Sequence, residues 1–111
     1  MSKTGWFGVD LDGTLAMDGP WKGLSHVGEP IPAMVARVKT WVASGQRVKI
    51  MTARASIAEP ERSVVVEAIQ DWLVEQKLPR LEVTSQKDFE MLVLYDDRCI
   101  QVEPNTGRLV G

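Results

Sequence analysis

Three observations in the sequence predict an α/β fold with a mostly parallel central sheet. Short apolar runs of strand length alternate along the chain with segments whose apolar residues recur at helical spacing, the pattern of strands joined by crossover helices. The length of 111 residues is that of one domain. With 44% hydrophobic and 25% charged residues, the composition is that of a globular protein. We therefore expect residues 1–111 to form a single Rossmann-like domain with three layers.

The first half of the chain is expected to contain a strand, a loop, a helix and a second strand. The run from Trp6 to Val9 is apolar and stops at an aspartate, which predicts a strand. Four glycines and two prolines interrupt residues 13–30 and predict a loop. A helix is expected from about Pro32 to Ser44, followed by a strand from Val48 to Met51. The apolar residues of this helix are Met34, Val35, Val38, Trp41 and Val42.

A polar turn, a helix and two strands are expected in the second half. The turn covers Thr52 to Ala58, and the helix runs from about Pro60 to Lys77. Strands are expected at Leu81 to Thr84 and at Met91 to Tyr95. Because the last of these is apolar throughout, we expect it to be buried on both faces. The predicted apolar face of the helix comprises Val64, Val65, Ala68, Ile69, Trp72 and Leu73.

The C-terminal residues contain one further signal. The turn Asn105-Thr106-Gly107 lies between two short apolar segments, Ile100 to Val102 and Arg108 to Val110. This pattern predicts either a hairpin or an added edge strand.

Charge and cysteine content exclude several classes of protein. With 13 Lys and Arg against 15 Asp and Glu, the formal charge of −2 gives no general attraction to nucleic acid or to anionic membranes, although a local basic patch stays open. The longest apolar run is five residues, far short of the roughly 20 that span a bilayer. A single cysteine, Cys99, cannot form an internal disulfide, and Met1 to Gly5 lacks the pattern of a signal peptide. We therefore expect a cytoplasmic protein that does not bind membranes.

Carboxylates follow the first and the last predicted strand. Asp10 and Asp12 come directly after one, and Asp96 and Asp97 after the other. If the two strands are neighbours, these groups converge, and their mutual repulsion favours a bound cation. Oxygen ligands alone suit Mg²⁺, whereas one Cys and one His exclude the usual structural zinc sites. The alternative is ordinary turn chemistry, since Asp-Gly is a common turn pair, but a second Asp pair after another strand weighs against it.

These motifs resemble those of the haloacid dehalogenase superfamily of phosphotransferases. The stretch Val9-Asp10-Leu11-Asp12-Gly13-Thr14-Leu15 is similar to the first motif, which implies that Asp10 is the nucleophile and Asp12 the acid and base. Thr52, in Lys49-Ile50-Met51-Thr52-Ala53-Arg54, corresponds to the second motif, and the pair Asp96 and Asp97 to the fourth. Intervals of about 20 and 6 residues after the relevant strands leave no room for the cap domain common in that superfamily. The resemblance is to its small capless members.

The third motif of the superfamily, a Lys or Arg, is matched least directly. Lys87 is the best candidate, but only three residues separate it from Met91, too few for a usual crossover helix. An ordinary solvated loop lysine is the alternative. Lys49 lies inside a strand and Lys77 at a helix end, so neither replaces it well.

The resemblance also implies how the remaining site residues act. Mg²⁺ would be held by Asp10, the Asp12 carbonyl and one or both of Asp96 and Asp97, with Asp97 favoured as the direct ligand. Lys87 would offset negative charge on Asp10 and the phosphate. The residues expected to bind substrate are Thr52, Ala53, Arg54 and Arg98, and for the two arginines an ordinary ion pair is an equal alternative. In the loop after the first strand, His26 is expected at the surface or as a cap, and Trp21 either stacks on substrate or packs over the sheet end.

The function expected from this site is Mg²⁺-dependent hydrolysis of phosphomonoesters through an aspartyl-phosphate. The partner would be a phosphorylated substrate, either a small molecule or the exposed phosphate of a macromolecule such as an oligonucleotide end. A non-catalytic module of the same fold that binds metal or phosphate is the main alternative. A phosphotransferase or mutase is a third, disfavoured because without a cap water reaches the intermediate. The oligomeric state stays open.

Overall fold

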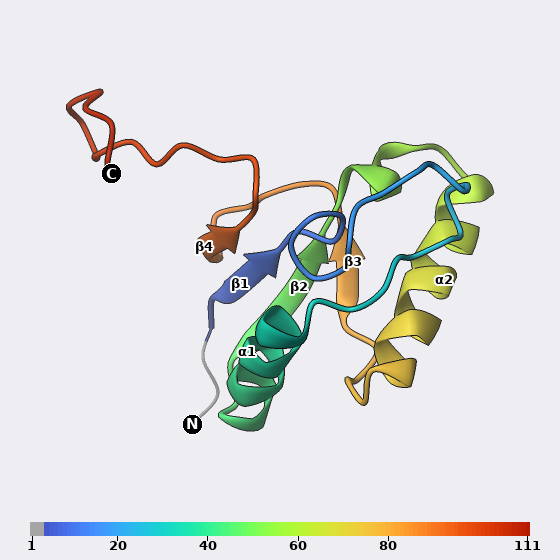
Figure 1. The fold of residues 1–111 in the computed structure, drawn as a ribbon. Helices are drawn as coiled ribbons and strands as arrows, with labels where there is room; N and C mark the ends of the chain where they lie inside the picture. The colour runs from blue at the N-terminus through green and yellow to red at the C-terminus, as the bar shows by residue number, and fades with distance from the viewer. Residues whose placement is uncertain (1–3) are drawn as a thin grey trace.

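The computed structural model describes residues 4–111 and contains a four-stranded sheet in the order β3-β2-β1-β4, with every neighbouring pair parallel (Figure 1). The α/β class, the parallel sheet and the sequence of elements are confirmed, with bounds within two residues of those expected. The strands are β1 Trp6–Val9, β2 Arg47–Met51, β3 Glu82–Thr84 and β4 Met91–Tyr95, and the helices are α1 Pro32–Ala43, η1 Ala53–Ser56 and α2 Glu61–Glu75.

The apolar core lies between the two long helices and one face of the sheet. Val9 pairs in register with Ile50, and Phe7 with Val48, so these side chains point to the same face. Trp41 of α1 packs at 5.1 Å, edge to face, against the Phe7 ring on this side. The helices contribute Met34, Val35 and Val38 from α1, and Val65, Ile69, Trp72 and Leu73 from α2.

The opposite face of the sheet is covered by the connection 85–90 rather than by a helix. This connection joins the two outer strands, and Asp88 within it accepts a hydrogen bond of 2.8 Å from the Trp6 indole. Trp6 is fully buried there, and the ammonium of Lys49 lies 4.7 Å from its ring. Lys49 also pairs with Asp88 at 3.6 Å and with Glu82 at 3.4 Å. Ion pairs around one tryptophan therefore form the outer layer on this side.

Two burial predictions are wrong. Strand β4 was expected to be buried on both faces, but Leu92 is 60% and Val93 37% exposed, because β4 is an outer strand of the sheet. Val64 was expected on the apolar face of α2 but is 58% exposed. The buried stripe of α2 begins at Val65 and repeats at Ile69, so Val64, about 100° away around the helix, faces outward.

Of the two alternatives predicted for the C-terminal segment, the structure contains the hairpin. Val102 and Leu109 make an antiparallel bridge, and the amide of Glu103 donates to the carbonyl of Arg108 at 2.7 Å. Figure 1 shows this segment, drawn in red, leading away from the sheet. Within residues 4–111, no helix combines the length and apolarity needed to cross a membrane.

Candidate functional site

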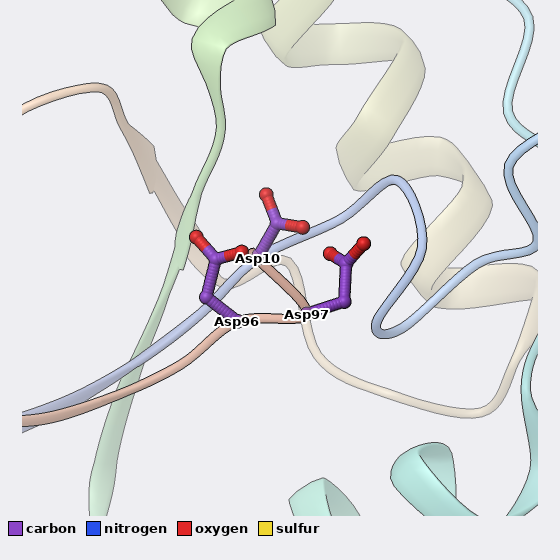
Figure 2. A group of neighbouring side chains, drawn as sticks. All are labelled: Asp10, Asp96 and Asp97. Atoms are coloured by element: carbon purple, nitrogen blue, oxygen red, sulfur yellow. The ribbon is translucent and has the colours of Figure 1, made fainter. Parts of the chain in front are cut away.

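Three carboxylates meet at the carboxyl ends of two neighbouring strands. Asp10 follows β1, and Asp96 and Asp97 follow β4; the parallel pairing of these strands brings them together. The amide of Asp10 donates to the carbonyl of Tyr95 at 2.9 Å, which ties the two strand ends to each other. One carboxylate oxygen from each residue lies within 4.8 Å of the others. Figure 2 shows the three side chains grouped at the two strand ends. Of the four carboxylates expected to converge, these three do, whereas Asp12 does not join them.

Thr14 and Gly13 hold this group in place. The Thr14 hydroxyl accepts from the Asp97 amide at 3.0 Å and lies 3.1 Å from Asp97 Oδ1 and 3.4 Å from Asp10 Oδ2. Gly13 has a φ of 92°, and a Cβ built on it would lie 2.5 Å from Asp97 Oδ2. Only glycine combines this backbone conformation with so close an approach of the carboxylate.

The carboxylate cluster is electrostatically strained. Partial burial and the nearby charges of Asp96 and Asp97 raise the pKa of Asp10 from 3.8 to about 7. The hydrogen bond that links Asp10 to Asp97 lowers the pKa of Asp97. As the pH falls through about 7, the pair therefore takes up its proton on Asp10, an arrangement expected where several negative charges share a site.

Asp12 points away from this cluster, toward Arg54. Leu11, between the two aspartates, is fully buried. Arg54 donates to both Asp12 oxygens at 2.8 Å, a bidentate ion pair in which the arginine side chain is only 11% exposed. Asp12 is accordingly absent from the group of carboxylates that could share a metal ion.

Arg54 also fixes the loop between Asp12 and α1. Its Nη1 atom lies within hydrogen-bonding distance of three loop carbonyls, those of Gly23 at 3.3 Å, Leu24 at 2.7 Å and His26 at 2.7 Å. Its guanidinium carbon lies 5.4 Å from the centre of the Trp21 ring. Of the two interpretations offered by the sequence for Arg54, the ion pair describes this structure. The guanidinium acts here as a clamp between Asp12 and the loop.

A cavity of about 930 Å³ opens beside the carboxylates. Asp10, Asp12 and Asp96 line it, and more than half of the lining residues come from the loop after β1, including Trp21 and His26. The volume is typical of sites for small ligands. The loop thus forms a wall of the cavity.

The other predicted site residues divide between the cavity and its surroundings. Thr52, Ala53 and Arg98 line the cavity. Thr52 is buried at the carboxyl end of β2, where its hydroxyl accepts from the Arg54 amide at 3.2 Å. Lys87 is exposed on the β3–β4 connection and is not among the residues that line the cavity, so the structure does not bring it to the carboxylates.

Sequence reasoning gave no role to Thr14, the hydroxyl that bridges the two strand ends. The sequence signal that could have indicated this role is the position of Thr14 directly after Asp12-Gly13, in the turn that follows β1. Lys22 and Ser85 also line the cavity and were not predicted. Nothing local distinguishes them, because their position depends on how the loops fold over the sheet.

Comparisons with known proteins support the fold. No protein-family model matches this sequence, and no curated protein matches it. The structure is similar to that of a conserved protein coded by a locus from Bacteroides thetaiotaomicron, with a TM-score of 0.59 and 20% sequence identity over 87% of this chain and 78% of that one. At this identity the likeness shows the α/β fold alone.

Proposed function

We propose that this protein is a Mg²⁺-dependent phosphomonoester hydrolase of the haloacid dehalogenase type, with Asp10 as the nucleophile. The observation that carries the proposal is the meeting of Asp10, Asp96 and Asp97 at one edge of the sheet, beside a cavity that Thr52 also lines. A carboxylate nucleophile, further acidic groups for a cation and a hydroxyl donor are the parts that phosphoryl transfer requires.

The donor set fits a hard divalent cation. All three groups are carboxylates, which Mg²⁺ prefers. Burial raises the pKa of Asp10, and repulsion by the charges of Asp96 and Asp97 raises it further. Asp10, Asp96 and Asp97 would hold the ion, with Asp97 the favoured direct ligand. Bound Mg²⁺ would relieve this repulsion and neutralise charge on the phosphoryl oxygens.

Asp10 would attack the phosphorus in line, so that an Asp10–phosphorus bond forms as the bond to the leaving oxygen breaks. The leaving oxygen would take a proton from Asp12, and Asp12 would later remove a proton from the water that releases phosphate. Thr52 would donate its hydroxyl hydrogen to a phosphoryl oxygen. The hydroxyl oxygen accepts a hydrogen bond from the Arg54 amide, which leaves the hydroxyl hydrogen available for this purpose. For Asp12 to act, one of its oxygens must leave Arg54.

That last requirement favours a second candidate, a non-catalytic module that binds metal or phosphate. Arg54 occupies both oxygens of Asp12, and the predicted Lys87 lies away from the cluster. A protein of this kind would bind Mg²⁺ and phosphate without turnover. The proposed substrate class for the enzyme is a phosphorylated small molecule or an exposed phosphate of a macromolecule, with Trp21 and Arg98 as contacts at the cavity. A cytoplasmic setting completes the proposal.

Hydrolysis of an aryl phosphate tests the proposal. We expect activity with Mg²⁺, none with chelator, and loss to background in Asp10→Asn. Asp71→Asn is a matched control, since Asp71 is an exposed carboxylate on α2 paired with Arg80 at 2.7 Å. A rate in Asp10→Asn near that of the unmodified protein would remove the nucleophile assignment. Binding of Mg²⁺ and phosphate by calorimetry, with no turnover of any phosphorylated compound, would establish the second candidate.

A further inference from the structure

Strand β4 leaves an apolar edge of the sheet uncovered. It pairs only with β1 among the described elements, so its outer backbone groups have no partner strand in residues 4–111. Its sequence, Met-Leu-Val-Leu-Tyr, carries no charge, and Leu92 and Val93 are exposed. Phe89, two residues before the strand, is fully exposed. Uncharged, uncovered edge strands are rare in monomers because they pair readily with other chains.

The C-terminal hairpin, residues 100–110, is the second exposed apolar element. It leads away from the sheet in Figure 1, and Ile100, Val102, Leu109 and Val110 are between 45% and 74% exposed. Its two oppositely charged residues, Glu103 and Arg108, pair with each other. The hairpin therefore presents apolar side chains without a net charge that would oppose docking on an apolar strand.

We propose that a second copy of this chain covers both elements, with the hairpin of each chain lying on the β4 edge and Phe89 of the other. If the two chains are related by a two-fold axis, the contact between hairpin and β4 edge forms twice, and both β4 edges are covered. The seven exposed side chains of the two elements present roughly 700 Å² per chain. This is close to the ~800 Å² that each partner buries in a standard-size stable interface. The proposal is independent of the proposed enzymatic function.

The mass of the protein in solution gives the first test. At about 100 µM, a concentration that reveals association in the micromolar range, sedimentation should give twice the chain mass of 12.3 kDa. Leu109→Asp and Phe89→Asp should each weaken association about tenfold or more, because each puts a charge into an apolar contact. Val64→Asp is the matched control, an exposed apolar residue on α2, and should leave the dimer unchanged. Both interface positions are exposed in the single chain, so circular dichroism should show native folding in all three variants.

Mixing the two weakened variants tests the exchange itself. In a mixed dimer, the intact hairpin of the Phe89→Asp chain meets the intact β4 edge of the Leu109→Asp chain, so one of the two contacts is restored. Because a contact already disrupted by one aspartate loses little more from a second, the mixture should associate more tightly than either variant alone. A monomer at 100 µM, a dimer insensitive to Leu109→Asp, or a mixture no tighter than its components would each overturn the proposal.

Discussion

Arg54→Ala should strongly destabilise the fold. We expect it to lower the free energy of unfolding by about 3–5 kcal/mol, the range measured when one partner of a buried ion pair is removed. The size follows from what the side chain does in the structure. It makes two bonds of 2.8 Å to Asp12 and reaches three loop carbonyls, and it is 11% exposed.

The bonds to Asp12 set the lower part of this range. A hydrogen bond to a charged group contributes about 1.5–3 kcal/mol, and the pair to Asp12 contains two. The carbonyls of Leu24 and His26 would lose their donor as well, but both lie in a loop that water can reach, so their added cost is small. The alanine also leaves the Asp12 carboxylate without its cation.

Urea titration followed by circular dichroism measures the effect, with chelator present so that metal binding does not contribute. Arg80→Ala is the matched control. Arg80 also bonds a carboxylate, Asp71, at 2.7 Å, but both side chains are about half exposed, so the loss should stay below about 1 kcal/mol.

A double-mutant cycle with Asp12→Asn separates the ion pair from the loop contacts. If the pair dominates, the two substitutions together should cost at least about 1.5 kcal/mol less than the sum of the single losses. A loss for Arg54→Ala no larger than that for Arg80→Ala would refute the clamp, and so would strict additivity with Asp12→Asn.

Three further predictions concern the carboxylate cluster. The pKa of Asp10 is raised from 3.8 to about 7 in the folded state, so between these pH values the folded chain holds a proton that the unfolded chain releases. Without metal, the free energy of unfolding should therefore fall as the pH rises from about 4 to about 7, by at most about 1.4 kcal/mol per pH unit. Urea titrations across pH should show this slope, and Asp10→Asn should flatten it. Mg²⁺ at a hundredfold excess over its dissociation constant should stabilise the fold by about 2.7 kcal/mol, and Asp97→Ala should reduce that gain; thermal melts unchanged across millimolar Mg²⁺ would contradict the site. Gly13→Ala should lower the free energy of unfolding by about 1 kcal/mol or more and reduce the stabilisation by Mg²⁺, because its Cβ would lie 2.5 Å from Asp97 Oδ2. Gly19→Ala is the control: a Cβ there would have no atom within 4 Å, so the stabilisation by Mg²⁺ should be unchanged.

The local pattern of apolar residues was sufficient to predict the helices and strands, and with them the approach of Asp10 to Asp96 and Asp97. The helical spacing of α1 and α2 and the apolar runs of the strands are local properties, so their positions followed from the sequence. The approach of Asp10 to Asp96 and Asp97 needed one further assumption, that β1 and β4 are neighbours, which the pairing confirms.

Strand order and loop paths are non-local, and there the sequence was insufficient. An uncharged run such as β4 has the same pattern in the centre of a sheet as at its edge, so the exposure of Leu92 could not be read from it. Arg54 is 42 positions from Asp12 in sequence, and its contacts to the loop depend on how that loop folds back over the sheet.

The contrast between the two groups of carboxylates is the strongest physical reason to expect a cation. Asp12 has a cation from its own chain, held in a bidentate pair with Arg54. Asp10, Asp96 and Asp97 have no ion pair with any Lys or Arg in residues 4–111. Burial, together with the charges of Asp96 and Asp97, raises the pKa of Asp10. A fold that uses Gly13 and Thr14 to hold Asp97 against Asp10 maintains this repulsion at a cost in stability. Such a cost is expected where a site is preorganised for an external positive charge, and removing one carboxylate without metal should therefore stabilise the fold while removing it with metal should not.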